Sequence, residues 1–242
     1  MNSKDEIIDR FNGLRDLNNR IIKCIGNTND KLLEDPIRIL RAIRLSIIYD
    51  FKLDNDIIDF IKNNKILIKK ISYYRKKEEL DKIFSSNNKL VGLKKLKELN
   101  LLEVLELNYS EVKFTNDING IYAQINICDK YSFSKETKKI ISNIKEIIKL
   151  KEINNITLYK YGLYINSIAG EILGYNSAEI NKMYKSLPIK TRKDIKITYK
   201  SIVKLNNNCY NSVNEIYRLL EENILNYSLR NKVKDIVKFI RK

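Results

Sequence analysis

The 242-residue sequence contains no histidine and no tryptophan, and only seven glycines, two prolines and three cysteines. Without histidine, a Ser-His-Asp triad, a histidine-based acid–base pair and an imidazole metal site are all excluded. The scarcity of glycine and proline argues against an all-β fold, which needs many tight turns. Cys24, Cys128 and Cys209 are widely separated and odd in number, which indicates a reducing compartment instead of a disulfide framework.

Long apolar runs are also missing. No run approaches the roughly 18–20 residues that a membrane span needs, and the first 25 residues are too polar for a signal peptide. We therefore expect a cytoplasmic protein with no membrane partner.

Positive charge is abundant. The chain has 46 Lys and Arg against 30 Asp and Glu, for a formal net charge of +16. Such an excess draws a protein toward polyanions, nucleic acid above all. An AT-rich genome would produce part of the same lysine excess, so the positions of the cations matter more than their sum.

Helical periodicity runs through most of the chain after residue 30. The predicted helices cover residues 35–50, 54–63, 76–85, 89–99, 117–130, 134–150, 158–173, 177–186, 212–222 and 228–241. The sequence therefore predicts a mostly α fold, an elongated array of helices without internal repeats.

The first 29 residues are the exception. Asn12-Gly13 is the strongest short-range signal for a β-hairpin. The expected arms carry Ile7, Ile8 and Phe11 on one side of the turn and Ile21, Ile22 and Ile25 on the other. A lone hairpin is marginal in water, so we expect the border of a sheet whose other strands are missing.

Residues 34–45 read "EDPIRILRAIRL" and combine two acids with three arginines. Asp35 is placed to cap a helix with Pro36 at its first position. The apolar side chains gather on one face, while Arg38 and Arg41 project from the opposite face. The simplest interpretation is a solvated face with ion pairs worth about 0.2–0.5 kcal/mol each.

The stretch "RIIKCIGNTNDKLLEDPIRILRAIRLSIIYDFKL" resembles the class II tRNA nucleotidyltransferases, the CCA-adding enzymes, and their bacterial poly(A) polymerase relatives. In that family a β-hairpin ending D-G-x-x-D-L precedes E-D-P-x-R-x-L-R-A-x-R-F and then G-F. The matching residues are Asp9, Gly13, Asp16, Leu17, Glu34, Asp35, Pro36, Arg38, Leu40, Arg41, Ala42 and Arg44. Leu45 stands where the family prefers Phe, and Asp50 replaces Gly.

Further similar segments lie at residues 71–84, 93–105 and 186–197, so the resemblance covers nearly the whole chain. It implies neck, body and tail domains of this family at residues 30–110, 111–187 and 188–242, after a remnant of a palm domain at 1–29. The neck would select nucleotides and bind RNA, and the tail would bind tRNA.

The resemblance implies that Asp35 and Arg38 form an amino-acid template for the incoming base. A carboxylate accepts the amino group of cytosine or adenine, while a guanidinium donates to their ring acceptors. Uracil and guanine would leave these groups mismatched, at a cost on the order of a few kcal/mol. Glu34 would orient Arg38, and Arg41 would either neutralise triphosphate or hold the helix.

The family builds its active site on the preceding palm domain, where paired aspartates bind two Mg²⁺. Asp54 and Asp56 have a similar spacing but open an apolar helix, where capping is the better explanation. "GLRD" at 13–16 superficially matches a catalytic G-x-x-R-D but belongs to the predicted hairpin. We expect no catalytic residue, metal site or cofactor in this chain. Mg²⁺ and CTP or ATP would enter only with a palm domain.

Two basic groups are candidates for contact with RNA phosphates, whose attraction is electrostatic and weakens with salt. They comprise Lys69, Lys70, Arg75, Lys76 and Lys77, and then Lys190, Arg192, Lys193 and Lys196. A solvated lysine-rich surface is the alternative for each group.

These observations predict the RNA-binding and nucleotide-selecting portion of a CCA-adding enzyme, which acts in tRNA 3′-end processing. It would bind the tRNA acceptor arm, be inactive alone and need a palm domain on a separate polypeptide. The alternative is a non-catalytic RNA-binding protein, or a fragment from a split or decayed gene.

Overall fold

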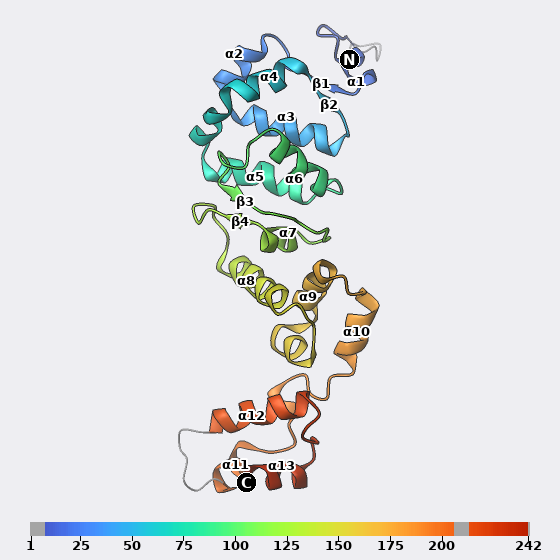
Figure 1. Cartoon of the computed structure of the whole chain (residues 1–242), viewed down its shortest axis with the longest axis vertical. Helices are drawn as coiled ribbons and strands as arrows, with labels where there is room; N and C mark the ends of the chain where they lie inside the picture. Colours follow the sequence, from blue (N-terminus) through green and yellow to red (C-terminus); the bar gives the residue numbers. More distant parts are fainter. Residues whose placement is uncertain (1–7, 206–212, 242) are drawn as a thin grey trace. The chain divides into compact units, whose positions relative to one another are not determined.

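The computed structural model describes residues 8–205 and 213–241 (Figure 1). Ile7 and Cys209, which entered the sequence analysis, lie outside these residues. The described part contains thirteen α-helices, two short 3₁₀ helices and four strands of two residues each, which confirms the predicted mostly α fold. The chain divides into two compact units, Met1–Ile141 and Ser142–Lys242. The predicted domain boundaries remain predictions.

The first unit begins with a short helix and a strand and continues mainly as helices. Its elements are α1 (Gly13–Asn18), β1 (Ile21–Ile22), α2 (Thr28–Glu34), α3 (Ile37–Ile48), β2 (Lys52–Leu53), α4 (Asn55–Asn64), η1 (Lys65–Lys70), α5 (Tyr73–Phe84), α6 (Lys89–Glu98), β3 (Leu107–Asn108), α7 (Ile118–Gln124) and β4 (Asn126–Ile127). The helix α8 (Lys135–Leu150) spans the division. The second unit holds α9 (Asn155–Leu173), α10 (Ser177–Lys185), η2 (Arg192–Asp194), α11 (Tyr199–Leu205), α12 (Val213–Leu225) and α13 (Val233–Ile240).

The predicted N-terminal hairpin is wrong. Asn12 does adopt the left-handed conformation typical of a hairpin turn, with φ of 59°. However, the Asp9 carboxylate accepts hydrogen bonds from the backbone N–H groups of Gly13 (2.8 Å) and Leu14 (2.9 Å). Those N–H groups lie at the start of a helix, where they lack partners within the helix, so the acceptor stabilises α1. The strand β1 instead pairs in parallel with β2, and Ile21 lies opposite Lys52.

The core of the first unit surrounds α3, which lies alongside α5 and α6 (Figure 1). Leu40, Ile43 and Ile47 of α3 are almost fully buried. Burying a side chain of this size contributes about 1.5–3 kcal/mol. A Cβ at Gly92 of α6 would lie 2.5 Å from Cγ2 of Ile83, so glycine permits α6 to approach α5 closely. This packing fixes the start of α3 relative to α5.

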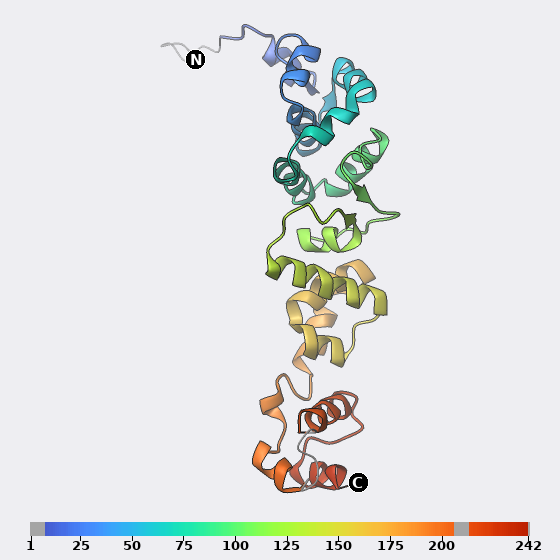
Figure 2. The ribbon, with the colours of Figure 1, turned by 90° about the vertical axis from the view of Figure 1, so that its left-hand side faces the viewer.

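The second unit is organised around α9 and α10 (Figure 2). Gly162 has φ of 73° and interrupts the helical geometry of α9. The buried Asn166 amide spans this break by donating to the carbonyls of Gly162 (2.7 Å) and Thr157 (2.9 Å). Further along α9, a Cβ at Gly170 would lie 2.1 Å from Cδ1 of Ile180, so glycine allows the contact with α10.

No helix among residues 8–205 and 213–241 combines the length and apolarity needed to cross a membrane.

Candidate functional site

The two residues predicted to select the base lie together where α2 meets α3. Asp35 has an extended backbone directly after α2, with φ of −143° and ψ of 95°. Pro36 follows it, and Arg38 belongs to the first turn of α3. The Asp35 side chain is 29% exposed and that of Arg38 is 34% exposed. Both charged groups are therefore accessible from solvent, and each is held by a different partner.

Arg38 is held through one nitrogen only. Its Nη1 donates to Oε2 of Glu34 at 2.9 Å and to the carbonyl oxygen of Lys31 at 3.0 Å. These hydrogen bonds with Arg38, and a further one with Lys31, hold the pKa of Glu34 below its usual value. Glu34 thus contacts Arg38 as its predicted orienting role requires. Within the described residues no hydrogen bond uses Nε or Nη2 of Arg38, which leaves both donors available to a base.

Asp35 is held by Arg75, forty residues away in the first turn of α5. Nη1 and Nη2 of Arg75 donate to Oδ1 and Oδ2 of Asp35 at 3.1 and 2.9 Å. This two-pronged hydrogen bond lowers the pKa of Asp35 although partial burial acts against it. Ser72 caps α5, and its hydroxyl accepts from the Arg75 backbone N–H at 3.4 Å. Sequence reasoning assigned Arg75 to RNA and missed this contact, because no local pattern connects the two residues.

The face of α3 that carries Arg38 continues toward a cleft. Residues 38, 41, 45 and 49 share one face at helical spacing. Arg41 is exposed and has no ion pair with any described residue. Leu45 and Tyr49 both line the cleft. One face of a single helix therefore leads from Arg38 to a cleft with a mixed apolar and polar lining.

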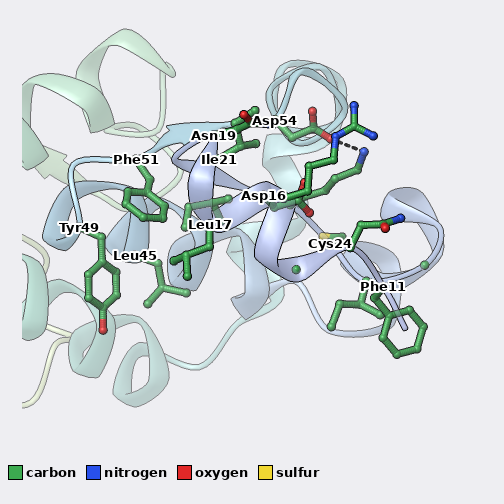
Figure 3. Close-up of a pocket in the computed structure, with 17 residues that line it drawn as sticks. Phe11, Asp16, Leu17, Asn19, Ile21, Cys24, Leu45, Tyr49, Phe51 and Asp54 are labelled. Carbon is green, nitrogen blue, oxygen red and sulfur yellow. Dashed lines mark ion pairs between the residues drawn. The ribbon is translucent and has the colours of Figure 1, made fainter. Parts of the chain in front are cut away.

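The cleft lies between α1, β1 and the end of α3 (Figure 3). Its volume is about 710 Å³, and apolar side chains from these elements line it together with polar ones. Phe11 and Tyr49, at its two ends in Figure 3, are 64% and 61% exposed. Asp54 of the lining makes no capping bond to α4, and its carboxylate lies 3.9 Å from the Lys23 ammonium. Within the described part of the chain, β1 pairs with β2 along one edge only.

The first group of predicted RNA contacts is largely engaged elsewhere. Lys76 is 1% exposed, and its ammonium lies 4.1 Å from the centre of the Tyr73 ring. Burial lowers the pKa of Lys76, and this placement contradicts the predicted RNA contact. Arg75 binds Asp35, and Nζ of Lys77 lies 2.6 Å from Oδ2 of Asp81. Because their charges are neutralised locally, Arg75 and Lys77 are poorly suited to phosphate.

In the second group, Arg192 has a structural contact. Its Nε donates to Oε1 of Glu221 at 2.8 Å and its Nη1 donates to Oδ1 of Asn214 at 3.2 Å, which ties η2 to α12. In the first group, Lys69 lies 3.9 Å from Glu103. The predicted cations that are exposed and whose ammonium groups form no ion pair among the described residues are Lys70, Lys190, Lys193 and Lys196. The ammonium of Lys190 lies 5.4 Å from the centre of the Tyr184 ring, and its backbone N–H donates to Asp194 at 2.8 Å.

No group of three or more acidic or cysteine side chains that could hold a metal ion occurs in the described ranges.

Two family models match the chain. The model of the RNA- and SrmB-binding site of polymerase A matches residues 50–110. The model described as tRNA nucleotidyltransferase domain 2 matches residues 112–240, more than half of the sequence. The chain belongs to the tRNA nucleotidyltransferase family. The resemblance seen in the sequence is thereby confirmed for this family member.

Its relatives are CCA-adding enzymes. That of Ligilactobacillus salivarius is 29% identical over 235 residues, which cover 84% of this chain and 58% of the relative. The Streptococcus uberis enzyme is 27% identical over 269 residues, covering 98% of this chain and 67% of the relative. This tRNA nucleotidyltransferase family member thus spans little more than half the length of the first of these enzymes.

Solved structures share the fold. The Bacillus stearothermophilus CCA-adding enzyme, solved in complex with CTP, matches with a TM-score of 0.81 at 19% identity, over 96% of this chain and 68% of that one. The Thermotoga maritima enzyme, solved with tRNA, matches with a TM-score of 0.67 at 18% identity, over 96% of this chain and 66% of that one. These neighbours support the helical fold of this family member.

Proposed function

We propose that this chain is the nucleotide-selecting and tRNA-binding portion of a CCA-adding enzyme and acts in tRNA 3′-end processing. One observation carries the proposal: Asp35 and Arg38 lie three residues apart where α2 meets α3, both side chains are accessible, and each is oriented by its own partner. Relatives that share the fold were solved with CTP and with tRNA, which supports the same ligands here.

The template works by matching donors and acceptors. The Asp35 carboxylate accepts from the amino group of cytosine or adenine, and the free nitrogens of Arg38 donate to the ring. Uracil would direct a carbonyl oxygen at the carboxylate, and guanine would direct an N–H at the guanidinium. Both mismatches leave charged groups unpaired, so CTP and ATP are preferred.

We further propose that a palm domain carried by another polypeptide docks on the cleft and on the unpaired edge of β1. Large apolar side chains such as Phe11 and Tyr49 are costly to leave in water, and a sheet edge offers backbone groups to a further strand. The palm would supply the Mg²⁺ site for transfer of the nucleotide, and CTP or ATP would be bound between the two partners.

Co-purification followed by mass spectrometry tests the partner. Recovery of a small palm-domain protein with this chain supports the proposal. Recovery of a longer polypeptide that contains both parts places the palm in the same chain instead. Capture of neither, with tRNA still bound, supports the second candidate function of a non-catalytic RNA-binding protein. The exposed cations Lys190, Lys193 and Lys196 of the second unit favour it.

The template is tested with Arg38→Ala in the enzyme completed by a palm domain. We expect discrimination among CTP, ATP and UTP to be lost while tRNA affinity remains within about twofold, because Arg38 reads the base and not phosphate. Nucleotide incorporation and tRNA binding are measured on the same preparations. If tRNA binding collapses while base preference persists, Arg38 is not the template residue.

A further inference from the structure

Arg75 reaches the proposed template from a different part of the fold. Its position in the first turn of α5 is fixed by the Ser72 cap and by the burial of Leu80 and Ile83 of the same helix. The guanidinium then binds both oxygens of Asp35 at 2.9 and 3.1 Å. The packed helix α5 therefore holds the carboxylate of Asp35, which is itself an extended residue between α2 and α3.

The geometry of this contact points to a role beyond neutralising charge. We propose that Arg75 is a positioning residue that fixes the plane of the Asp35 carboxylate for base selection, an inference that rests on the proposed function. A carboxylate offers about four lone-pair sites, and a two-pronged arginine occupies one on each oxygen. A backbone hydrogen bond from Ile37 also reaches the carboxylate, and the sites that are still left are available to the amino group of a base, in a plane set by the guanidinium.

Two physical consequences follow from the fixed plane. A carboxylate that rotates freely would lose entropy when it binds the amino group, whereas one already oriented loses less. The ionised form is also favoured, because Arg75 lowers the pKa of Asp35. A protonated carboxyl would present a donor and would then fit the carbonyl of uracil. Asp35 is ionised at neutral pH even at its ordinary pKa, so Arg75 maintains selectivity there through orientation, and its effect on protonation matters only in acid.

Lysine in place of arginine separates these two effects. Its ammonium keeps a positive charge near Asp35 but is a point charge without a planar fork. Arg75→Lys should therefore keep the pKa of Asp35 lowered and lose much of the fixed orientation, while Arg75→Gln loses both the lowered pKa and the orientation. The matched control is Lys62→Gln, which breaks an exposed ion pair with Asp59 at 3.2 Å on α4, away from the template.

The experiment uses the full chain labelled with ¹⁵N and ¹³C and completed by an unlabelled palm domain, because the nucleotide is proposed to bind between the two. CTP and UTP are titrated to millimolar concentration, and their affinities are taken from the shifts of the Arg38 side-chain and neighbouring backbone signals. The pKa of Asp35 is measured from its carboxyl carbon. Wild type, Arg75→Gln, Arg75→Lys, Asp35→Asn and Lys62→Gln are compared, with thermal unfolding of each as the check on folding.

We expect Arg75→Gln to lower the CTP-to-UTP affinity ratio about tenfold and to raise the pKa of Asp35 toward its usual value. Arg75→Lys should lower the ratio by less and leave the pKa of Asp35 depressed. If Arg75→Gln does not fold, Arg75→Lys still tests the inference. Lys62→Gln should resemble wild type in both measurements.

Three results would contradict the inference. If both Arg75 variants keep the wild-type ratio while Asp35→Asn loses it, Arg75 does not position the template, although the proposed function stands. If Asp35→Asn keeps the ratio, or if wild type does not discriminate, the proposed template fails and the role of Arg75 fails with it.

Discussion

Around the start of α3, Glu34 pairs with Arg38 and Lys31, while Asp35 pairs separately with Arg75. Glu34 with Arg38 is a local pair of residues four apart, whereas Asp35 with Arg75 joins two helices. Solvent-exposed pairs of this kind contribute little to stability. Their main effect is orientation. The local pair could be expected from the spacing in the sequence, and the long-range pair could not.

Lysines that look alike in the sequence differ sharply in the structure, and this difference predicts their effect on RNA. Lys76→Met should leave tRNA affinity unchanged, because the buried ammonium cannot reach phosphate. Lys193→Gln should weaken binding and lower the slope of log affinity against log salt by about 0.7–0.9, since one phosphate contact is lost. Filter binding over a series of salt concentrations measures both. Equal losses in the two variants would contradict the assignment.

At the scale of elements, most of the helices follow from apolar periodicity alone. The helices predicted at 89–99, 134–150 and 177–186 agree with α6, α8 and α10 within a residue or two. The helix predicted at 117–130 ends at Gln124 because the following residues pair with β3 as β4. That pairing depends on tertiary contact, which periodicity does not contain.

The N-terminal error has a similar cause. Asn12-Gly13 permits a left-handed residue, which occurs both in hairpin turns and before helices. Here the Asp9 carboxylate accepts a hydrogen bond from the first N–H of the helix and so favours the helix. The strand partner of β1 lies some thirty residues downstream. Parallel pairing needs such a long connection, so a search for short-range turns cannot find it.

The close approach of α9 and α10 yields a prediction at this scale. Gly170→Ala should destabilise the chain by about 1–3 kcal/mol, because the new Cβ would overlap Ile180 and crowd Ile153. Gly13→Ala is the matched control, since the nearest atom to its Cβ would be 3.7 Å away. Chemical denaturation compares the two variants. If Gly170→Ala were as stable as the control, α9 and α10 could move apart without a loss in the free energy of unfolding, and the prediction would be wrong.

At the scale of the whole molecule, the chain carries a net charge of +16 and divides into two units, and each unit has its own candidate surface. The first unit holds the proposed template pair and the cleft. The second unit holds three of the four predicted cations that are exposed and whose ammonium groups form no ion pair among the described residues. Base selection and phosphate contact are thus assigned to different parts of the chain, which should be separable by mutation.

The cleft yields a prediction about the partner. Phe11→Ser combined with Tyr49→Ser should reduce capture of a palm-domain protein at least about tenfold, because exposed aromatic side chains contribute strongly when an interface buries them. Since both residues are exposed, the melting temperature should change little. Tyr199→Ser, at a residue 62% exposed in α11, is the matched control. Undiminished capture by the double variant would place the partner elsewhere.

The shared face of α3 links these surfaces mechanically. Arg38 and Tyr49 are eleven residues apart, so these two residues lie about 16 Å from each other along α3, while Leu45 brings the lining of the cleft closer to Arg38. A partner that tilts this helix on docking would therefore also change the orientation of Arg38 near its other end. Fidelity of base choice would then depend on whether the partner is bound, without any contact between partner and base.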